Sequence, residues 1–263
     1  MRIKFLGTGS GLTSLKRFHS SLLVTSHNFN LLVDCGDGIS RAILNQSIGC
    51  NVIDSILISH LHPDHYSGLP SLITQMKLCG RTKELSVFVH SSNKNFIDEF
   101  IFHSYLFKER LNFKLNIIPF DEEKEIKLIS DFTFISKLNS HLEKYRRASL
   151  ETSPLQENRL DFASLSFYFK DDENSAIYSG DVGSEIDLFL FNQKVDWFIT
   201  EITHIKVENL EEVFEILNPG KMILTHIGDD FEEILKVYLE SLQKPLKSLI
   251  FLAFDELELN QSM

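Results

Sequence analysis

Short runs of apolar residues, separated by turn-forming residues, divide the chain into predicted strands and helices. Runs rich in apolar and β-branched residues predict strands at 2–6, 21–25, 30–34, 55–59, 86–90, 113–118, 132–138, 164–169, 176–179, 197–200, 222–225 and 249–252. Helices are predicted between them at 39–48, 69–78, 96–106, 210–217 and 231–242. The alternation predicts a layered α/β domain.

The segment 143–162 is polar and lacks a regular apolar spacing, so we expect a loop there. No linker rich in proline, glycine or serine divides the 263 residues, and a chain of this length is within the range of one domain.

The composition limits the class of protein. Hydrophobic residues make up 43% of the chain, which excludes a disordered protein. No run approaches the roughly 20 apolar residues that cross a bilayer, and the N-terminus lacks the pattern of a signal peptide. Three cysteines without a CxxC pair are typical of a reduced protein. We therefore expect a cytoplasmic protein with no membrane partner.

Residues 60–65 read HLHPDH and directly follow the apolar run 55–59. Three imidazoles and a carboxylate are costly to bury without a shared partner, and a divalent metal ion supplies one. His60 and His62 alternate at a strand end, so their rings can converge on one ion. Asp64 and His65 fall on the following turn and could reach a second ion. The alternative, a surface loop rich in histidine by chance, does not account for this spacing.

HLHPDH resembles the H-x-H-x-D-H signature of the metallo-β-lactamase superfamily. The longer segment SHLHPDHYSGLPSLI, together with FLGTGSG, LLVDCGDG and YSGD, resembles the ribonuclease Z branch and its relatives among cyclic phosphodiesterases. The resemblance implies a four-layer αββα sandwich of two mixed β-sheets flanked by helices. It implies a single domain over 1–263 with halves at about 1–118 and 119–263, the site lying in a cleft along one edge. Dimers are common in this branch, which leaves a homodimer open.

The resemblance further implies the remaining ligands of the first ion. His141, in LNSH, resembles the third ligand beside His60 and His62, with a solvated loop histidine as the alternative. Asp181, in YSGD, resembles the aspartate that bridges two ions, and Gly180 before it allows a close backbone turn.

The resemblance implies a second ion bound by Asp64, His65 and His226, the last in MILTHIGDD. Asp34, in LLVDCGDG, resembles the aspartate that orients a ligand histidine through its far nitrogen. The expected cofactor is two divalent ions. Imidazole and carboxylate ligands suit zinc, with manganese or iron as alternatives.

Two such ions about 4 Å apart can bind a bridging hydroxide and lower its pKa toward neutrality. Ribonuclease Z carries HEAT after the bridging aspartate, where this chain has TEITH. Glu201 matches the glutamate, Thr200 replaces the histidine, and we expect His204 to act as the acid. A polar loop histidine is the alternative. Asp64, Glu201 and His204 are therefore the expected catalytic residues.

The charge of the chain argues against RNA as the substrate. The net charge is −11, and the stretch between His141 and Gly180 holds no glycine, unlike the basic, glycine-rich arm with which ribonuclease Z grips tRNA. Beside His141, the basic residues Lys144, Arg146 and Arg147 form either a solvated face or a phosphate site, with Arg146 and Arg147 as candidate phosphate ligands. We expect a small or cyclic phosphodiester as the substrate.

Other functions stay open at this point. One is tRNA 3′ processing, and another is hydrolysis of a carbon ester, thioester or lactone, because fold and metal do not fix the bond that is cleaved. A third is a non-catalytic binding module, which the complete ligand set argues against.

Overall fold

The computed structural model describes residues 1–152 and 160–260 and contains two mixed β-sheets of seven strands each. The chain divides into two compact units, and each unit holds one of the sheets. The first unit comprises Met1–Asp121 and the chain from Ala253 onward, and the second comprises Glu122–Leu252. These units differ from halves of about 1–118 and 119–263 mainly in the last segment, which pairs with the first strand of the chain.

The sheet of the first unit has the strand order β14-β1-β2-β3-β4-β5-β6. Its strands are β1 (Arg2–Gly7), β2 (Ser21–Ser26), β3 (Phe29–Val33), β4 (Ser55–Leu57), β5 (Leu85–His90), β6 (Leu115–Phe120) and β14 (Glu258–Leu259). The strands from β3 to β6 are parallel neighbours, and the pairs at the β14 edge are antiparallel. The carboxyl ends of β3 and β4 therefore meet at one edge of the sheet.

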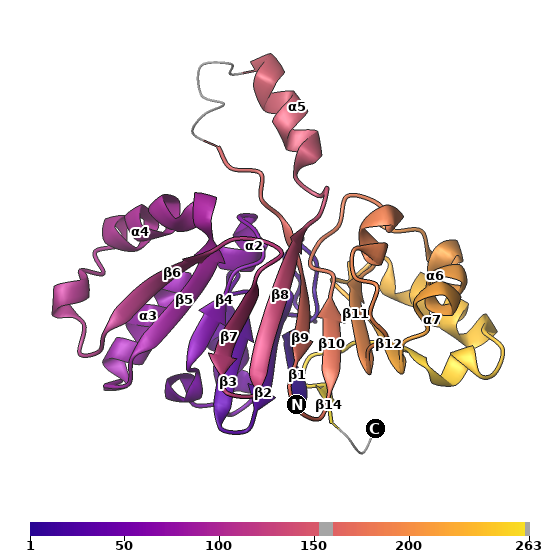
Figure 1. The fold of residues 1–263 in the computed structure, drawn as a ribbon, viewed down its shortest axis with the longest axis horizontal. Coiled ribbons are helices and arrows are strands. Elements are labelled where there is room, and N and C mark those ends of the chain that lie inside the picture. The colour runs from indigo at the N-terminus through magenta and orange to yellow at the C-terminus, as the bar shows by residue number, and fades with distance from the viewer. Residues whose placement is uncertain (153–159, 261–263) are drawn as a thin grey trace. The chain divides into compact units, whose positions relative to one another are not determined.

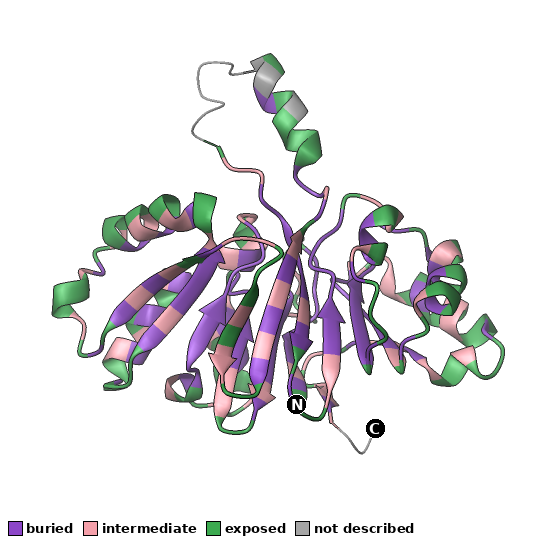
Figure 2. Cartoon of the chain, viewed as in Figure 1, coloured by how far each residue is buried: buried purple, intermediate pink, exposed green. Residues whose placement is uncertain are grey.

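Helices connect the parallel strands of the first unit, as parallel pairing requires. They are α1 (Ile39–Asn45), α2 (Pro63–Tyr66), α3 (Leu69–Leu78) and α4 (Lys94–His103). The predicted helix 69–78 has the observed bounds, and it buries Leu69, Leu72, Ile73 and Met76, which lie on one face of a helix. The strands β4 and β5 are buried along most of their length (Figure 2).

The sheet of the second unit has the strand order β13-β12-β11-β10-β9-β8-β7. Its strands are β7 (Glu125–Ile129), β8 (Phe132–Leu138), β9 (Leu165–Lys170), β10 (Ser175–Tyr178), β11 (Trp197–Glu201), β12 (Lys221–Thr225) and β13 (Ile250–Leu252). The strands from β10 to β13 are parallel, whereas β7, β8, β9 and β10 pair antiparallel. Because β8 and β10 both run antiparallel to β9, the carboxyl ends of β8, β10, β11 and β12 share one edge.

The second unit also contains α5 (Glu143–Thr152), α6 (Leu210–Leu217) and α7 (Glu232–Ser241). Short 3₁₀ helices occur at η1 (Cys50–Val52), η2 (Ser91–Asn93), η3 (Lys108–Arg110), η5 (Glu185–Phe189), η6 (Val207–Asn209) and η7 (Leu246–Ser248). In the part of the chain that the structure describes, no helix combines the length and apolarity needed to cross a bilayer.

The expectation of a loop over 143–162 is wrong for its first ten residues, which form α5. This helix lacks an apolar stripe because most of its described side chains are exposed, and it extends beyond the ends of β8 and β9 (Figure 1). Good helix formers such as glutamate, lysine, arginine and alanine stabilise it instead of packing. The Nε atom of Arg146 lies 3.2 Å from Oε1 of Glu143, one turn earlier.

Candidate metal centre

Asp34 organises the candidate residues of the first unit. It follows β3 in the left-handed conformation, with φ 62°. Its Oδ1 accepts a hydrogen bond from the Ser59 amide at 2.8 Å, and its Oδ2 accepts one from the Ser59 hydroxyl at 2.8 Å. The Nδ1 atom of His65 lies 2.8 Å from the same Oδ2, and both side chains are fully buried. A carboxylate at this nitrogen selects the tautomer with the proton on Nδ1, so Nε2 carries the lone pair.

The side chains of the HLHPDH motif form two close pairs of nitrogen and oxygen atoms. The Nε2 atom of His60 lies 3.1 Å from Nδ1 of His62, and the Nε2 atom of His65 lies 3.3 Å from Oδ2 of Asp64. His60 is buried, and its Nδ1 lies 3.0 Å from the Ser59 hydroxyl. The first unit thus presents two pairs of metal-ligating atoms.

Gly36 allows the turn that carries these pairs to approach the end of β3. A Cβ atom on Gly36 would overlap the carbonyl oxygen of Asp64, and one on Gly68 would overlap the carbonyl oxygen of Gly36. Between them, the amide of Cys35 donates to the carbonyl of His65 at 2.6 Å. Burial raises the pKa of the Cys35 thiol, so this side chain stays protonated and packs as a small apolar group.

The second unit brings His141, Asp181 and His226 together at the shared edge of its sheet. The Oδ2 atom of Asp181 lies 3.2 Å from Nε2 of His226 and 3.8 Å from Nε2 of His141. All three residues are buried. One carboxylate therefore stands between two imidazole nitrogens, as the bridging position expected for Asp181 requires.

Hydrogen bonds at the opposite nitrogens orient these two rings. The Nδ1 atom of His141 lies 3.3 Å from the carbonyl oxygen of Val182, and the Nδ1 atom of His226 lies 3.1 Å from the Thr203 hydroxyl. The same hydroxyl donates to the His226 carbonyl at 2.6 Å. His226 has φ 58°, a conformation that L residues rarely adopt. Because the Thr203 hydroxyl contacts both the carbonyl and the ring of His226, it stabilises this conformation.

Glu201 and His204 form a hydrogen-bonded pair beside these ligands. Glu201 is 1% exposed, and its Oε1 lies 2.8 Å from Nδ1 of His204 and accepts the Val182 amide at 3.1 Å. The His204 ring centroid lies 4.8 Å from that of His141 and 6.2 Å from that of His226. His204 is partly exposed, so a substrate can reach it.

The donor sets fit divalent metal ions. Two ligand atoms on one tetrahedral ion with bonds of about 2.0–2.1 Å lie about 3.3 Å apart. The four atom pairs described above have separations between 3.1 and 3.8 Å. Imidazole and carboxylate are the ligands that zinc, manganese and iron accept. The imidazole nitrogens and carboxylate oxygens that each unit brings together are thus of the kind that binds divalent metals.

Of the two candidate phosphate ligands, Arg146 and Arg147, only the side chain of Arg146 is described. The Arg146 guanidinium pairs with Glu143, and its Cζ lies 4.9 Å from the centroid of the Phe162 ring. The side chain of Arg147 lies outside the described residues. A phosphate-binding role for either residue stays a prediction.

The sequence interpretation missed Ser59 and Thr203, whose hydroxyls contact the rings of His60 and His226. Serine and threonine are common in loops, and the contacts of Ser59 with Asp34 and of Thr203 with His226 span 25 and 23 positions. Only the position of Ser59 and Thr203 beside candidate ligands or catalytic residues could have pointed to them.

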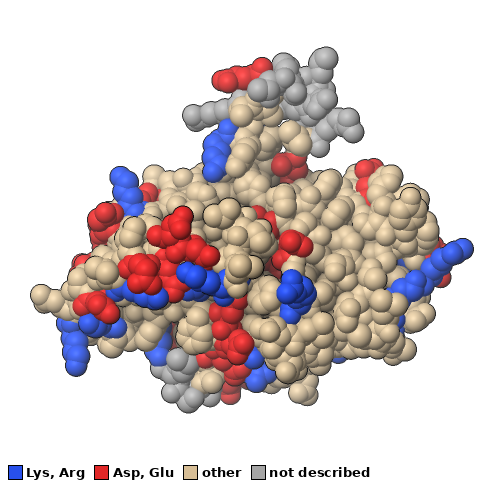
Figure 3. Space-filling model, turned by 180° about the vertical axis from the view of Figure 1, so that it is seen from behind, with Lys and Arg blue, Asp and Glu red and all other residues tan. Residues whose placement is uncertain are grey.

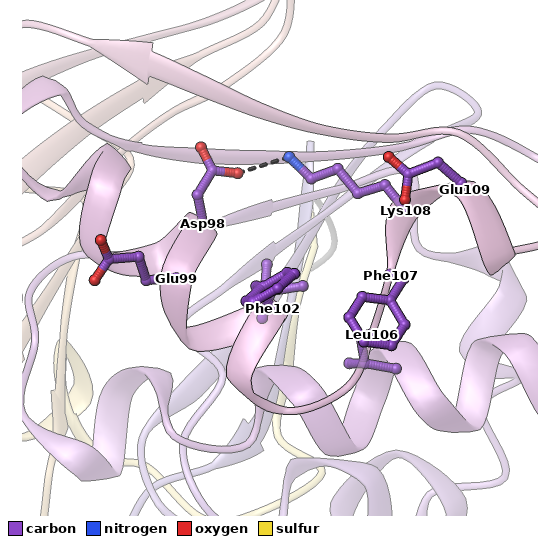
Figure 4. A pocket seen from close by; sticks show the side chains of 8 residues that line it. Asp98, Glu99, Phe102, Leu106, Phe107, Lys108 and Glu109 are labelled. Atoms are coloured by element: carbon purple, nitrogen blue, oxygen red, sulfur yellow. Dashed lines mark hydrogen bonds and ion pairs between the residues drawn. The ribbon is translucent and has the colours of Figure 1, made fainter.

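A pocket of about 360 Å³ lies elsewhere in the first unit, against α4 and η3 (Figure 4). Phe102, Leu106 and Phe107 contribute apolar side chains to it. Its carboxylate Asp98 is engaged by Lys94 at 2.7 Å and by Lys108 at 2.6 Å. Glu99 and Glu109 also line it, and no histidine stands among the described residues that line it, in contrast to the candidate metal centre.

Comparisons with known proteins agree with this geometry. The family model described as Anti-Pycsar protein Apyc1 matches residues 1–239. Ribonuclease Z of Methanococcus aeolicus is 23% identical over 295 residues, covering 94% of this chain and 91% of that protein. The metallo-β-lactamase fold protein YhfI from Bacillus subtilis superposes with a TM-score of 0.73 at 16% identity, covering 98% and 99% of the two chains. A diphosphatase from the PhnP family superposes with a TM-score of 0.70 at 18% identity, covering 98% and 97%.

The structural neighbours confirm the expected fold class, an α/β sandwich of the metallo-β-lactamase type with two mixed sheets. The sequence relatives confirm the resemblance to the ribonuclease Z branch. The chain therefore belongs to the Anti-Pycsar protein Apyc1 family and is a metal-dependent hydrolase of the ribonuclease Z-like branch of the metallo-β-lactamase superfamily.

Proposed function

We propose that the protein hydrolyses a small or cyclic phosphodiester with the help of two divalent ions. The first ion would be held by His60, His62, His141 and Asp181, and the second by Asp64, His65, Asp181 and His226. Zinc is the proposed ion, and manganese and iron are alternatives that the same donors accept. When bound, the ions supply an activated water and neutralise charge on the phosphoryl oxygens.

The observation that carries the proposal is the position of His204. Its ring stands near two proposed ligands, His141 and His226, and the carboxylate of Glu201 lies at its Nδ1. A metal site that only binds has no need of a partly exposed imidazole oriented in this way. A hydrolase that must release an alkoxide does, because the departing oxygen needs a proton.

His204 and Glu201 have separate roles in the proposed displacement at phosphorus. The attacking water gives up one proton to solvent, and its oxygen forms a bond to phosphorus while the bond from phosphorus to the leaving oxygen breaks. His204 gives its Nε2 proton to the leaving oxygen, and Glu201 stabilises the positive charge that the ring carries beforehand. In a cyclic substrate the leaving oxygen stays attached, so the product is a single phosphomonoester.

Charge supports a small substrate over a transfer RNA. The net charge of the chain is −11, and acidic and basic side chains are interspersed on the face drawn in Figure 3. The α5 helix contains Glu143 and Glu151 as well as its basic residues, and Arg146 pairs with Glu143. Tight binding to RNA requires several phosphates to be neutralised at once. The small substrate and a homodimeric assembly both stay proposals.

The test combines metal content with hydrolysis of bis(p-nitrophenyl) phosphate on protein purified without a chelating column. The variant is Asp181→Asn, and the matched control is Asp196→Asn, another carboxylate of the second unit, whose Oδ2 accepts hydrogen bonds from Ser175. We expect two ions per chain and turnover in the wild type and the control. We expect Asp181→Asn to lose metal and turnover together. A second panel then compares 3′,5′-cyclic nucleotides with precursor tRNA.

Each outcome decides between functions. Faster turnover of cyclic nucleotides supports the proposal, whereas cleavage of precursor tRNA alone would assign 3′ processing. If the protein binds metal and hydrolyses aryl esters but not phosphodiesters, its function is that of a carbon ester hydrolase. A wild-type protein that binds no divalent ion would overturn the proposal altogether.

A further inference from the structure

We propose that Asp187 is a positioning residue, which ties the loop carrying His141 to the loop carrying Asp181 and thereby sets the metal affinity of the site. The inference rests on the proposed metal centre and adds to it a residue that binds no metal itself. Asp187 belongs to η5 and is 8% exposed.

One oxygen atom of Asp187 receives hydrogen bonds from two separate loops. Its Oδ2 accepts the Ser140 amide at 3.1 Å and the Ser140 hydroxyl at 2.8 Å. The same Oδ2 accepts the amide of Gly183 at 2.8 Å and that of Ser184 at 3.3 Å. Ser140 directly precedes His141, and Gly183 follows Asp181 by two residues. A single carboxylate oxygen thus joins the backbones beside two proposed ligands.

Helix capping explains only part of this arrangement. Asp187 and Ser184 form the capping box of η5, and that role needs the Ser184 amide alone. Ser140 lies 47 positions earlier and belongs to no part of η5. Gly183 also fits closely against Ser140, because a Cβ atom at Gly183 would overlap its hydroxyl. The contacts to Ser140 therefore serve the junction of the two loops.

The junction bears directly on the metal ligands. The Nε2 atom of His141 and the Oδ2 atom of Asp181 lie 3.8 Å apart, and the Nδ1 atom of His141 contacts the carbonyl of Val182 in the same junction. Charged acceptors form hydrogen bonds roughly twice as strong as neutral ones. Replacing Asp187 by asparagine should weaken the junction, and alanine should release it.

The experiment measures binding of Co²⁺ to metal-stripped protein by titration calorimetry and by the visible absorption of the bound ion. Residues that orient ligands typically change metal affinity 10- to 100-fold, so we expect Asp187→Ala to weaken Co²⁺ binding within roughly that range. Asp187→Asn should lose less Co²⁺ affinity than Asp187→Ala. Its cobalt spectrum should still shift, because His141 is less well oriented. Ser140→Ala removes only the hydroxyl donor and should give a smaller loss in a protein that still folds.

Asp196→Ala is the matched control. The Oδ2 atom of Asp196 accepts the amide of Ser175 at 2.8 Å and its hydroxyl at 3.1 Å, the same donor pair at the opposite end of β10. We expect this control to keep the cobalt affinity and spectrum of the wild type. Wild-type affinity and spectrum in both Asp187→Asn and Ser140→Ala would overturn the inference and leave Asp187 as a helix cap. Absence of Co²⁺ binding by the wild type would instead overturn the proposed function, and this inference with it.

Discussion

The Nδ1 atom of His204 lies 2.8 Å from the Oε1 atom of Glu201, three residues earlier in the chain. Glu201 ends β11, and the turn after it brings His204 back over the carboxylate, whose Oε2 also accepts the His204 amide at 2.9 Å. With Nδ1 held by a carboxylate, only Nε2 can exchange a proton with a substrate. The position of this imidazole is therefore fixed by one residue through both its backbone and its ring.

We expect His204→Ala to act according to the leaving group of the substrate. For an alkoxide leaving group, loss of the acid should lower kcat by about 10²- to 10⁴-fold. For p-nitrophenolate, which leaves without protonation, the loss should be much smaller. The measurement compares kcat for a cyclic nucleotide and for bis(p-nitrophenyl) phosphate at equal metal content. Equal losses on both substrates would assign His204 to ligand positioning instead of proton transfer.

Removing Asp34 should weaken both folding and metal binding. Asp34→Ala leaves the Ser59 amide, the Ser59 hydroxyl and the His65 ring without their buried acceptor. Each lost partner costs about 1–3 kcal/mol, so we expect unfolding free energy to fall by at least about 3 kcal/mol. Zinc affinity should fall about 10- to 100-fold. Denaturant unfolding and chelator competition measure the two, with the exposed Asp37→Ala in the same loop as control. Unchanged zinc affinity would contradict the role given to Asp34.

Two glycine-to-alanine substitutions in the first unit should have opposite effects. Gly36→Ala places a methyl group into the carbonyl of Asp64, and we expect a loss of about 1–3 kcal/mol or more together with loss of metal. At Gly49, with φ −72°, the nearest atom to an added methyl is 3.8 Å away. Gly49→Ala should be neutral or stabilise by up to about 1 kcal/mol. Thermal unfolding with and without zinc tests both, and equal melting temperatures would show that the close approach at Gly36 is not required.

Thr203→Val should affect the second metal ion selectively. Valine keeps the shape of threonine but removes the hydroxyl that contacts Nδ1 and the carbonyl of His226. We expect about 1–2 kcal/mol of lost stability and weaker binding of one of two ions. Metal analysis after dialysis against graded chelator should then find an intermediate with one ion. Thr133→Val, on β8, is the control. Simultaneous loss of both ions from Thr203→Val would show that the threonine does not act on one ion alone.

The apolar pattern predicted most of the fold because most strands here are buried. The predicted strand 132–138 has the observed bounds, and so do the helices 69–78 and 210–217. The pattern missed β7, whose residues alternate between exposed and half-buried at the edge of a sheet. It also missed α5, which is stabilised by its helix-forming residues and local ion pairs and leaves no apolar stripe. Helices and strands that bury few apolar side chains therefore show no clear hydrophobic pattern in the sequence.

The candidate ligands are proposed from a motif and from strand ends, whereas most of the residues that contact them or their loops leave no local signal. His60, His62 and His65 stand in one short motif, and Asp181 and His226 each end an apolar run. Asp187 reaches Ser140 across 47 positions and Thr203 reaches His226 across 23. Such pairs form only when loops from different strand ends meet, and no local pattern encodes that meeting.

The segment from Ala253 onward belongs to the first unit although it follows the whole second unit in the sequence, and this order matters for biosynthesis. The last strand, β14, pairs with β1, and Asp255 just before it accepts the hydroxyl of Thr8 at 2.7 Å and the amide of Phe18 at 2.8 Å. A ribosome must therefore complete the entire second unit before the N-terminal sheet receives its edge strand. Until then β1 exposes an unpaired edge, which is a hazard for aggregation. The first sheet is therefore expected to gain its full set of strands only after β14 has left the ribosome.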